Sequence, residues 1–202
     1  PQFKDSGTTK IEMSEAADVG IANEGHLELS NLMLLKGMIQ GGSVGSKDVT
    51  LADVRQDASI EAEKVQLKEL NNAGTVKATE FAAAKSENTG NVEVGNLILA
   101  ENDRFFNQAA GSVKADLLVL NGGEFVNVDG NTSDIALTQI STGGQFTSDG
   151  DSNLQKVVSN EGTINLNKGN LNIAELDAKN SVYNQLGGHF KADKGFFEDS
   201  TL

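Results

Sequence analysis

The chain has 202 residues, of which 38% are hydrophobic and 22% charged, with one proline and no cysteine or tryptophan. Its net charge of −13 argues against binding to nucleic-acid phosphate, and the absence of cysteine excludes disulfides and thiol chemistry. The densest apolar runs, 32–35 and 117–120, are far shorter than the roughly 18 residues of a membrane helix, so we expect no membrane-spanning segment.

The first segment, 1–20, matches the rest of the chain poorly. Gly7 opens it, 18 residues before Gly25, and we expect an irregular first coil there. Residues 1–5 contain no apolar signal core, which predicts that any targeting peptide is missing or already removed.

A template of mostly apolar residues then repeats along the chain. Counted from an origin residue, these residues occur at offsets +2, +4, +7 and +9. The first six origins are Gly25, Gly42, Ala58, Gly74, Gly90 and Gly111. Alternation at +2/+4 and again at +7/+9 predicts two short strands per unit, each with one buried face.

The later units are looser and carry polar segments between 121 and 160. Their origins are Gly123, Gly144, Gly162 and Gly188. Polar stretches at 129–134 and 149–153, and a further departure at 177–180, are interpreted as loops inserted into the repeat. Departures from a repeat are where we expect a ligand surface.

The residue types at fixed offsets indicate a narrow interior and tight corners. Phe125, Phe146 and Phe190 share the +2 offset and are predicted to point inward, the first two stacked on each other. Small interior side chains are expected at Ala62, Ala78, Ala83, Ala115 and Ala192. Asparagines stand two residues before several glycines, where both residue types tolerate a left-handed corner: Asn23, Asn72, Asn88, Asn121 and Asn160.

These features predict an all-β fold, a right-handed parallel β-helix (β-solenoid) of about 10–11 coils with about 18 residues each. Residues 1–202 would form a single domain. Segments 14–19, 58–71 and 81–85 can also be written as helices, but the last two fit the strand template better because their neighbours obey the same offsets.

The two histidines, His26 and His189, each follow a repeat glycine by one residue, so both are expected to face outward. They are nine coils apart, about 43 Å at about 4.8 Å per coil, which is too far for one catalytic triad or one metal site.

Acidic pairs are the main argument for an enzyme. Adjacent coils place Asp129, Asp134, Asp149 and Asp151 in plausible range of one another, and glycosidases need two carboxylates about 5 to 9.5 Å apart. However, 29 acidic residues on the surface of a solenoid will form some close pairs by chance. Sugar-cleaving clefts also usually contain exposed aromatic side chains, and this chain has no tryptophan and a single tyrosine, Tyr183. Lyases of this fold resemble one another in using arginine and calcium, and only Arg55 and Arg104 are present here.

The segment Asp149-Gly150-Asp151-Ser152-Asn153 matches the first half of a calcium loop. Leu154 replaces the glycine that should follow, and Asn160 stands where the loop needs glutamate. A solvated corner is therefore the preferred interpretation. We expect no catalytic residue, no cofactor and no metal site.

Three phrases carry a resemblance to a known family: Asn160-Glu161-Gly162-Thr163-Ile164-Asn165-Leu166, Asn72-Ala73-Gly74-Thr75-Val76-Lys77-Ala78 and Leu186-Gly187-Gly188-His189-Phe190-Lys191-Ala192. They resemble the coils of filamentous-haemagglutinin-like and autotransporter adhesin passengers, β-helix exoproteins of Gram-negative bacteria. The resemblance covers residues 7–202 and implies a segment of a longer passenger, secreted or displayed outside the outer membrane.

The family likeness implies a non-enzymatic adhesin or stalk whose partners are host-cell or bacterial surface molecules, protein or glycan, with self-association as a further role. The long flat faces of a solenoid repeat the same kinds of surface side chain on each coil, which favours binding through many weak contacts at once. A polysaccharide-active enzyme and a structural fibre component are the alternatives. Sugar release distinguishes the first alternative, and ordered end-to-end assembly distinguishes the second.

Overall fold

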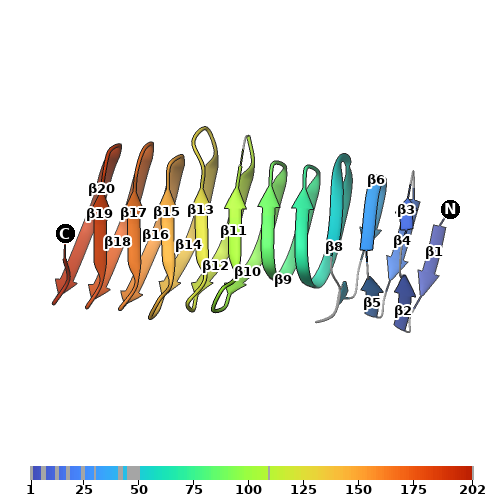
Figure 1. The fold of residues 1–202 in the computed structure, drawn as a ribbon, viewed down its shortest axis with the longest axis horizontal. Coiled ribbons are helices and arrows are strands. Elements are labelled where there is room, and N and C mark those ends of the chain that lie inside the picture. The colour runs from blue at the N-terminus through green and yellow to red at the C-terminus, as the bar shows by residue number, and fades with distance from the viewer. Residues whose placement is uncertain are drawn as a thin grey trace.

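The chain winds into a stack of β-coils around one long interior (Figure 1). The computed structural model describes the backbone of residues 2–5, 8–11, 14–16, 19–23, 26–29, 31–40, 43–44, 51–108 and 110–201. It describes the side chains of residues 38, 39, 52–108 and 110–201. Every regular element in these residues is a β-strand, which confirms the predicted all-β fold.

The strands fall into three groups along the chain. The first are β1 (Gln2–Asp5), β2 (Thr8–Ile11), β3 (Ser14–Ala16), β4 (Val19–Asn23), β5 (His26–Leu29), β6 (Asn31–Gln40) and β7 (Ser43–Val44). The long strands are β8 (Leu51–Asn72), β9 (Thr75–Asn88), β10 (Asn91–Leu99), β12 (Ser112–Leu120), β14 (Thr132–Ile140), β16 (Asp151–Asn160), β18 (Asn170–Lys179) and β20 (His189–Glu198). Short strands alternate with the later long ones: β11 (Arg104–Asn107), β13 (Glu124–Asn127), β15 (Gln145–Ser148), β17 (Thr163–Leu166) and β19 (Val182–Gln185).

Each coil pairs in parallel with the coils on either side of it, as the repeat predicts. One ladder passes through Ile39, Ile60, Val76, Val92, Val113, Ser133, Ser152, Leu171 and Phe190. These eight steps give about 19 residues per coil, close to the predicted 18, and Phe3 and Ile21 continue the ladder toward the N-terminus. The segments 58–71 and 81–85 lie within β8 and β9, so their helical alternative was wrong.

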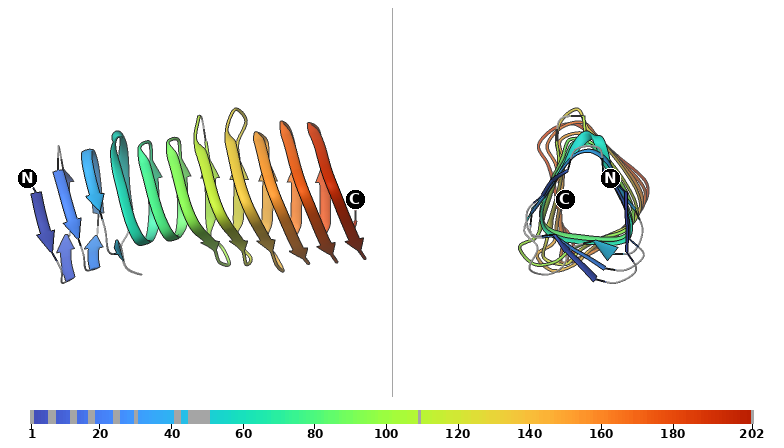
Figure 2. Two further views of the ribbon diagram at one scale, coloured as in Figure 1. Left: turned by 180° about the vertical axis from the view of Figure 1, so that it is seen from behind. Right: turned by 90° about the vertical axis from the view of Figure 1, so that its right-hand side faces the viewer.

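Each coil has three faces, one more than the two strands predicted, and the outline down the axis is triangular (Figure 2). In β9, residues 75–78 belong to face A, 80–83 to face B and 85–88 to face C. The strands β11, β13, β15, β17 and β19 continue face C. The apolar template did not reveal this face because its inward side chains in β9 are polar, Ser86 and Asn88.

The template also joined positions from different faces. Gly74 and Gly90 precede face A, whereas Gly123, Gly144 and Gly162 precede the face-C strands β13, β15 and β17. The strand β5 that follows Gly25 pairs through β7 with residues 64–65 on face B. Glycines occur at more than one corner, so a glycine alone does not identify which face comes next.

Phenylalanines fill the interior behind face C. Phe105, Phe125 and Phe146 are fully buried, and their rings stack at centroid distances of 5.5 and 5.4 Å. This confirms the predicted stack of Phe125 on Phe146. Phe190 also points inward, as predicted, but it does so on face A, where it pairs with Leu171 and packs half-buried against the core.

The predicted small interior side chains lie where a narrow core needs them. Ala62, Ala78, Ala83 and Ala115 are buried, and Ala192 in the last coil is half-buried. A Cβ atom on Gly90 would collide with the carbonyl oxygen of Gly74 on the coil before it, so only glycine fits at this corner.

Buried asparagines form a ladder beside the phenylalanine stack. Asn72 Nδ2 donates to Asn88 Oδ1 at 2.7 Å, Asn88 donates to Asn107 at 2.8 Å, and Asn107 donates to Asn127 at 2.8 Å. None of Asn72, Asn88, Asn121 and Asn160 is among the described residues with positive φ, so their predicted left-handed backbone was wrong. Asn72 and Asn88 instead end the face-C segments of their coils and satisfy one another's amides, while Asn121 and Asn160 are exposed at another corner. The side chain of Asn23 lies outside the described residues.

Candidate functional site

The outward surface of face A carries a column of alternating charge. Glu61, Lys77, Glu93, Lys114 and Asp134 follow one another in register on successive coils. Lys77 Nζ lies 3.4 Å from Glu93 Oε2, and Lys114 Nζ lies 3.6 Å from Glu93 Oε1. These side chains are exposed, so each pair adds only about 0.2–1 kcal/mol to stability. Their regular spacing nevertheless presents a patterned polar surface to any partner.

A shallow groove runs beside this column, where face A bends into face B. Its lining combines the small residues Ala62, Ala78 and Gly95 with four members of the charged column. Asp116 lines it at the corner position that Gly95 holds one coil earlier. An open groove lined by small and charged residues fits an extended polar chain, such as a glycan or a peptide, better than it fits an enclosed small molecule.

Three of the four acids considered for catalysis, Asp129, Asp134 and Asp151, are engaged with separate neighbours. Asp134 Oδ1 accepts a hydrogen bond from Asn153 at 2.8 Å on face A. Asp129, in the turn after β13, has its Oδ2 3.8 Å from Lys168 Nζ. Their contacts run to neighbouring coils and do not converge on one position.

The predicted inserted loop at 149–153 is mostly strand, because β16 begins at Asp151. Asp151 Oδ1 accepts hydrogen bonds from Asn170 Nδ2 at 2.7 Å and from its backbone N at 3.0 Å, and Asn153 Oδ1 accepts from Asn172 at 3.0 Å. These side chains extend the polar ladder of face A. Asp149 lies in the turn before them, and its Oδ1 is buried without a hydrogen-bond partner.

The other two predicted insertions lie partly in strands. Within 129–134, residues 129–131 belong to the turn between β13 and β14, whereas β14 begins at Thr132 and Ser133 is buried in the ladder of face A. Within 177–180, β18 continues to Lys179, and Ala178 is buried in the core. The polar composition of these segments suggested loops because alternate residues of the strands point outward into solvent, where polar side chains are favourable.

His189 and the two arginines lie on outer surfaces. His189 is exposed on face A, as predicted, whereas His26 belongs to β5 and its side chain lies outside the described residues. Arg55 is paired with Asp53 at 2.9 Å and Arg104 with Glu124 at 3.2 Å. Among the residues with described side chains, no three histidine, aspartate or glutamate side chains form a group that could hold a metal ion.

A surface that the sequence reasoning missed lies on the outside of face B. We call it the face-B patch, and it consists of the outward side chains of Ile98, Leu117, Val119, Leu137 and Val158. Ile98 is 43% exposed and the others are half-buried. The available signal was the continuous apolar run 117–120, which breaks the alternation expected of a strand with one solvated face.

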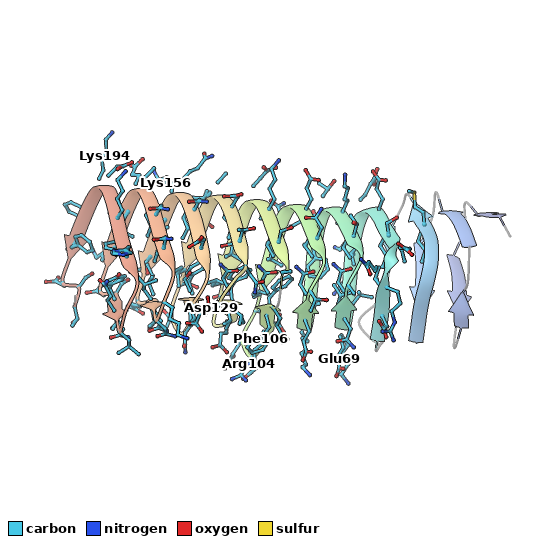
Figure 3. All side chains as sticks on the ribbon, turned by 90° about the horizontal axis from the view of Figure 1, so that it is seen from above. Glu69, Arg104, Phe106, Asp129, Lys156 and Lys194 are labelled. Carbon is cyan, nitrogen blue, oxygen red and sulfur yellow. The ribbon has the colours of Figure 1, made fainter. Side chains whose placement is uncertain are left out.

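Faces B and C look out on different sides of the rod. In the view from above, Lys156 and Lys194 of face B project to one side, and Glu69, Arg104 and Phe106 of face C project to the other (Figure 3). A partner that covers the face-B patch therefore leaves face C open.

No helix in the described part of the chain is long and apolar enough to cross a membrane. Comparison with protein-family models, with curated proteins and with solved structures found no match.

Proposed function

We propose that this chain is part of a non-enzymatic adhesin or stalk, secreted by a bacterium or displayed on its outer membrane. Its partners are host-cell or bacterial surface molecules, protein or glycan, and it associates with copies of itself. The observation that supports this proposal is the regular outer surface, on which one column such as Glu61, Lys77 and Glu93 repeats coil after coil.

Such a surface suits weak contacts made many times. Parallel strands place equivalent side chains about 4.8 Å apart along the axis, so a linear partner meets charged groups at a regular spacing, with the sign of the charge alternating from coil to coil. The free energies of the separate contacts accumulate once the partner is held in register. The groove along Ala62, Ala78 and Gly95 offers a path for such a linear partner.

The experiment is an adherence assay with the 202-residue chain coupled to beads. We expect the beads to bind at least one of three targets, namely epithelial cells, Gram-negative bacterial cells or immobilised matrix glycans. Substituting Lys77→Glu and Lys114→Glu together removes the charge alternation of face A and should reduce binding several-fold. Lys85→Ala on face C is the control, and beads that bind none of the targets contradict the attachment role.

A further inference from the structure

The outer surface of face B is apolar in the middle and charged toward both ends. One outward column runs through Lys64, Glu80, Asn96, Leu117, Leu137, Lys156, Glu175 and Lys194. A second outward column runs through Ile98, Val119, Gln139, Val158 and Asp177. The face-B patch occupies the central coils of both columns, and no charged side chain lies between Glu80 and Lys156 in the first column.

The charges on either side of the patch are placed symmetrically about Leu117. Glu80 lies two coils before Leu117, and Lys156 lies two coils after it. Lys64 lies three coils before, and Glu175 lies three coils after. At equal distances from the centre, the two ends therefore carry opposite charges.

We propose that the face-B patch binds the face-B patch of a second copy, with the two rods antiparallel and a two-fold axis along strand β12. This inference deepens the self-association part of the proposed function by assigning it a surface and an orientation. The axis places Leu117 and Val119 against their own counterparts in the second copy, so the most apolar coils face each other and lose contact with water.

The same axis brings opposite charges together. Glu80 faces Lys156 of the second copy, and Lys64 faces Glu175 of the second copy. Because the arrangement is two-fold symmetric, each pair occurs twice. Four ion pairs then flank an apolar centre, which is the usual anatomy of a specific interface.

Other arrangements of the same face place like charges together. Moving the axis to the midpoint between Leu117 and Leu137 sets Glu80 against Glu175 of the second copy and Lys64 against Lys194 of the second copy. Parallel rods instead bring Glu175 next to Asp177 of the second copy. The charges thus favour the antiparallel register centred on Leu117.

The dimensions indicate a weak dimer. Lys64 and Glu175 are six coils apart, about 29 Å along the axis at about 4.8 Å per coil, and the face is only two outward columns wide. This area is at the lower end of specific interfaces, so we expect micromolar association that becomes firm only when many copies are displayed together.

Sedimentation equilibrium of the 202-residue chain over a range of concentrations tests the proposal. We expect a monomer–dimer equilibrium for the unchanged chain and a monomer for Leu117→Lys, which sets two lysines against each other at the axis. Glu80→Lys should raise the dimer dissociation constant about tenfold, because two attractive pairs become repulsive. Lys156→Glu should do the same, and the double variant Glu80→Lys/Lys156→Glu should restore the original affinity.

A charge exchange on face A, Lys77→Glu/Glu93→Lys, is the matched control and should leave dimerisation unchanged. Circular dichroism establishes that each variant is folded, and Glu80 and Lys156 are exposed enough for substitution without loss of the fold. A chain that stays monomeric at every concentration overturns the proposal, as does a double variant that fails to recover. Either result leaves bead adherence to cells or glycans intact, whereas failure of attachment alone leaves the dimer intact.

Discussion

The central coils and the last coil bury their inward side chains to different extents. Phe105 and Phe125 in the central coils are fully buried, with other phenylalanine rings packed against both of their sides. In the last coil Phe197, which continues the inward column of Ala178, is 38% exposed. An inward position in a solenoid therefore becomes core only where a coil lies on each side of it, because the burial occurs between neighbouring coils.

The largest expected effect comes from removing one ring of the central stack. Phe125→Ala deletes a fully buried side chain between Phe105 and Phe146 and should lower the free energy of unfolding by about 3–5 kcal/mol. Phe197→Ala should lower it by less than about 1.5 kcal/mol, since its ring is already partly in water. Urea unfolding followed by circular dichroism measures both.

Phe196→Ala supplies the control for this pair of variants. Phe196 points outward from the same last coil and is 61% exposed, so its loss should change stability by no more than about 0.5 kcal/mol. Equal losses for Phe125→Ala and Phe197→Ala would show that the difference in burial between the two regions has no energetic weight.

A smaller effect is expected from the asparagine ladder of the central coils. Asn107→Ala removes the shortest of the hydrogen bonds donated by the Asn88 amide, which keeps the carbonyls of Gly90 and Ser112, and it leaves the buried carbonyl of Asn127 without a donor. The change should cost about 1–3 kcal/mol. Asn184 donates to Asn165 at 2.9 Å in an equivalent amide pair on the exposed surface of the last coils. Asn184→Ala should cost less than about 0.5 kcal/mol, because water replaces the lost partner.

Thermal unfolding of the two asparagine variants measures this contrast. The prediction fails if Asn184→Ala lowers the midpoint as far as Asn107→Ala does. An Asn107→Asp variant sharpens the interpretation further. It keeps an acceptor for Asn88 but replaces the donor to Asn127 with a carboxylate, so it should not restore stability.

Alternation in the sequence was enough to predict the parallel coils, the buried alanines and the stack of Phe125 on Phe146. The alternation did not predict face C as a separate strand, because asparagine is typical of turns and the partners that bury Asn88 lie on adjacent coils, 16 and 19 residues away. The polar runs at 149–153 and 177–180 resemble loops in the sequence because their outward side chains are polar. The face-B patch was missed because an apolar run such as 117–120 does not say which of its residues face outward.

The smallest effect concerns Tyr183, which joins the last coils to the core by packing on Phe190 with ring centroids 4.6 Å apart. Burial raises the pKa of Tyr183 from 10.0 to about 12. Between these pH values the unfolded chain has released the phenolic proton while the folded chain retains it, so stability should fall as the pH rises from about 10 to about 12. Tyr183→Phe should remove that part of the decline.

Because the chain has one tyrosine, its tyrosinate absorbance reports on this site alone. A titration midpoint near 12 in the folded protein means that the last coil stays closed over the Tyr183 ring. A midpoint near 10 means that the last coil opens before it unfolds, which would extend the contrast with the central coils from burial to dynamics. The alkaline titration of Tyr183 therefore shows, without any substitution, whether the last coil differs from the central coils in dynamics as well as in burial.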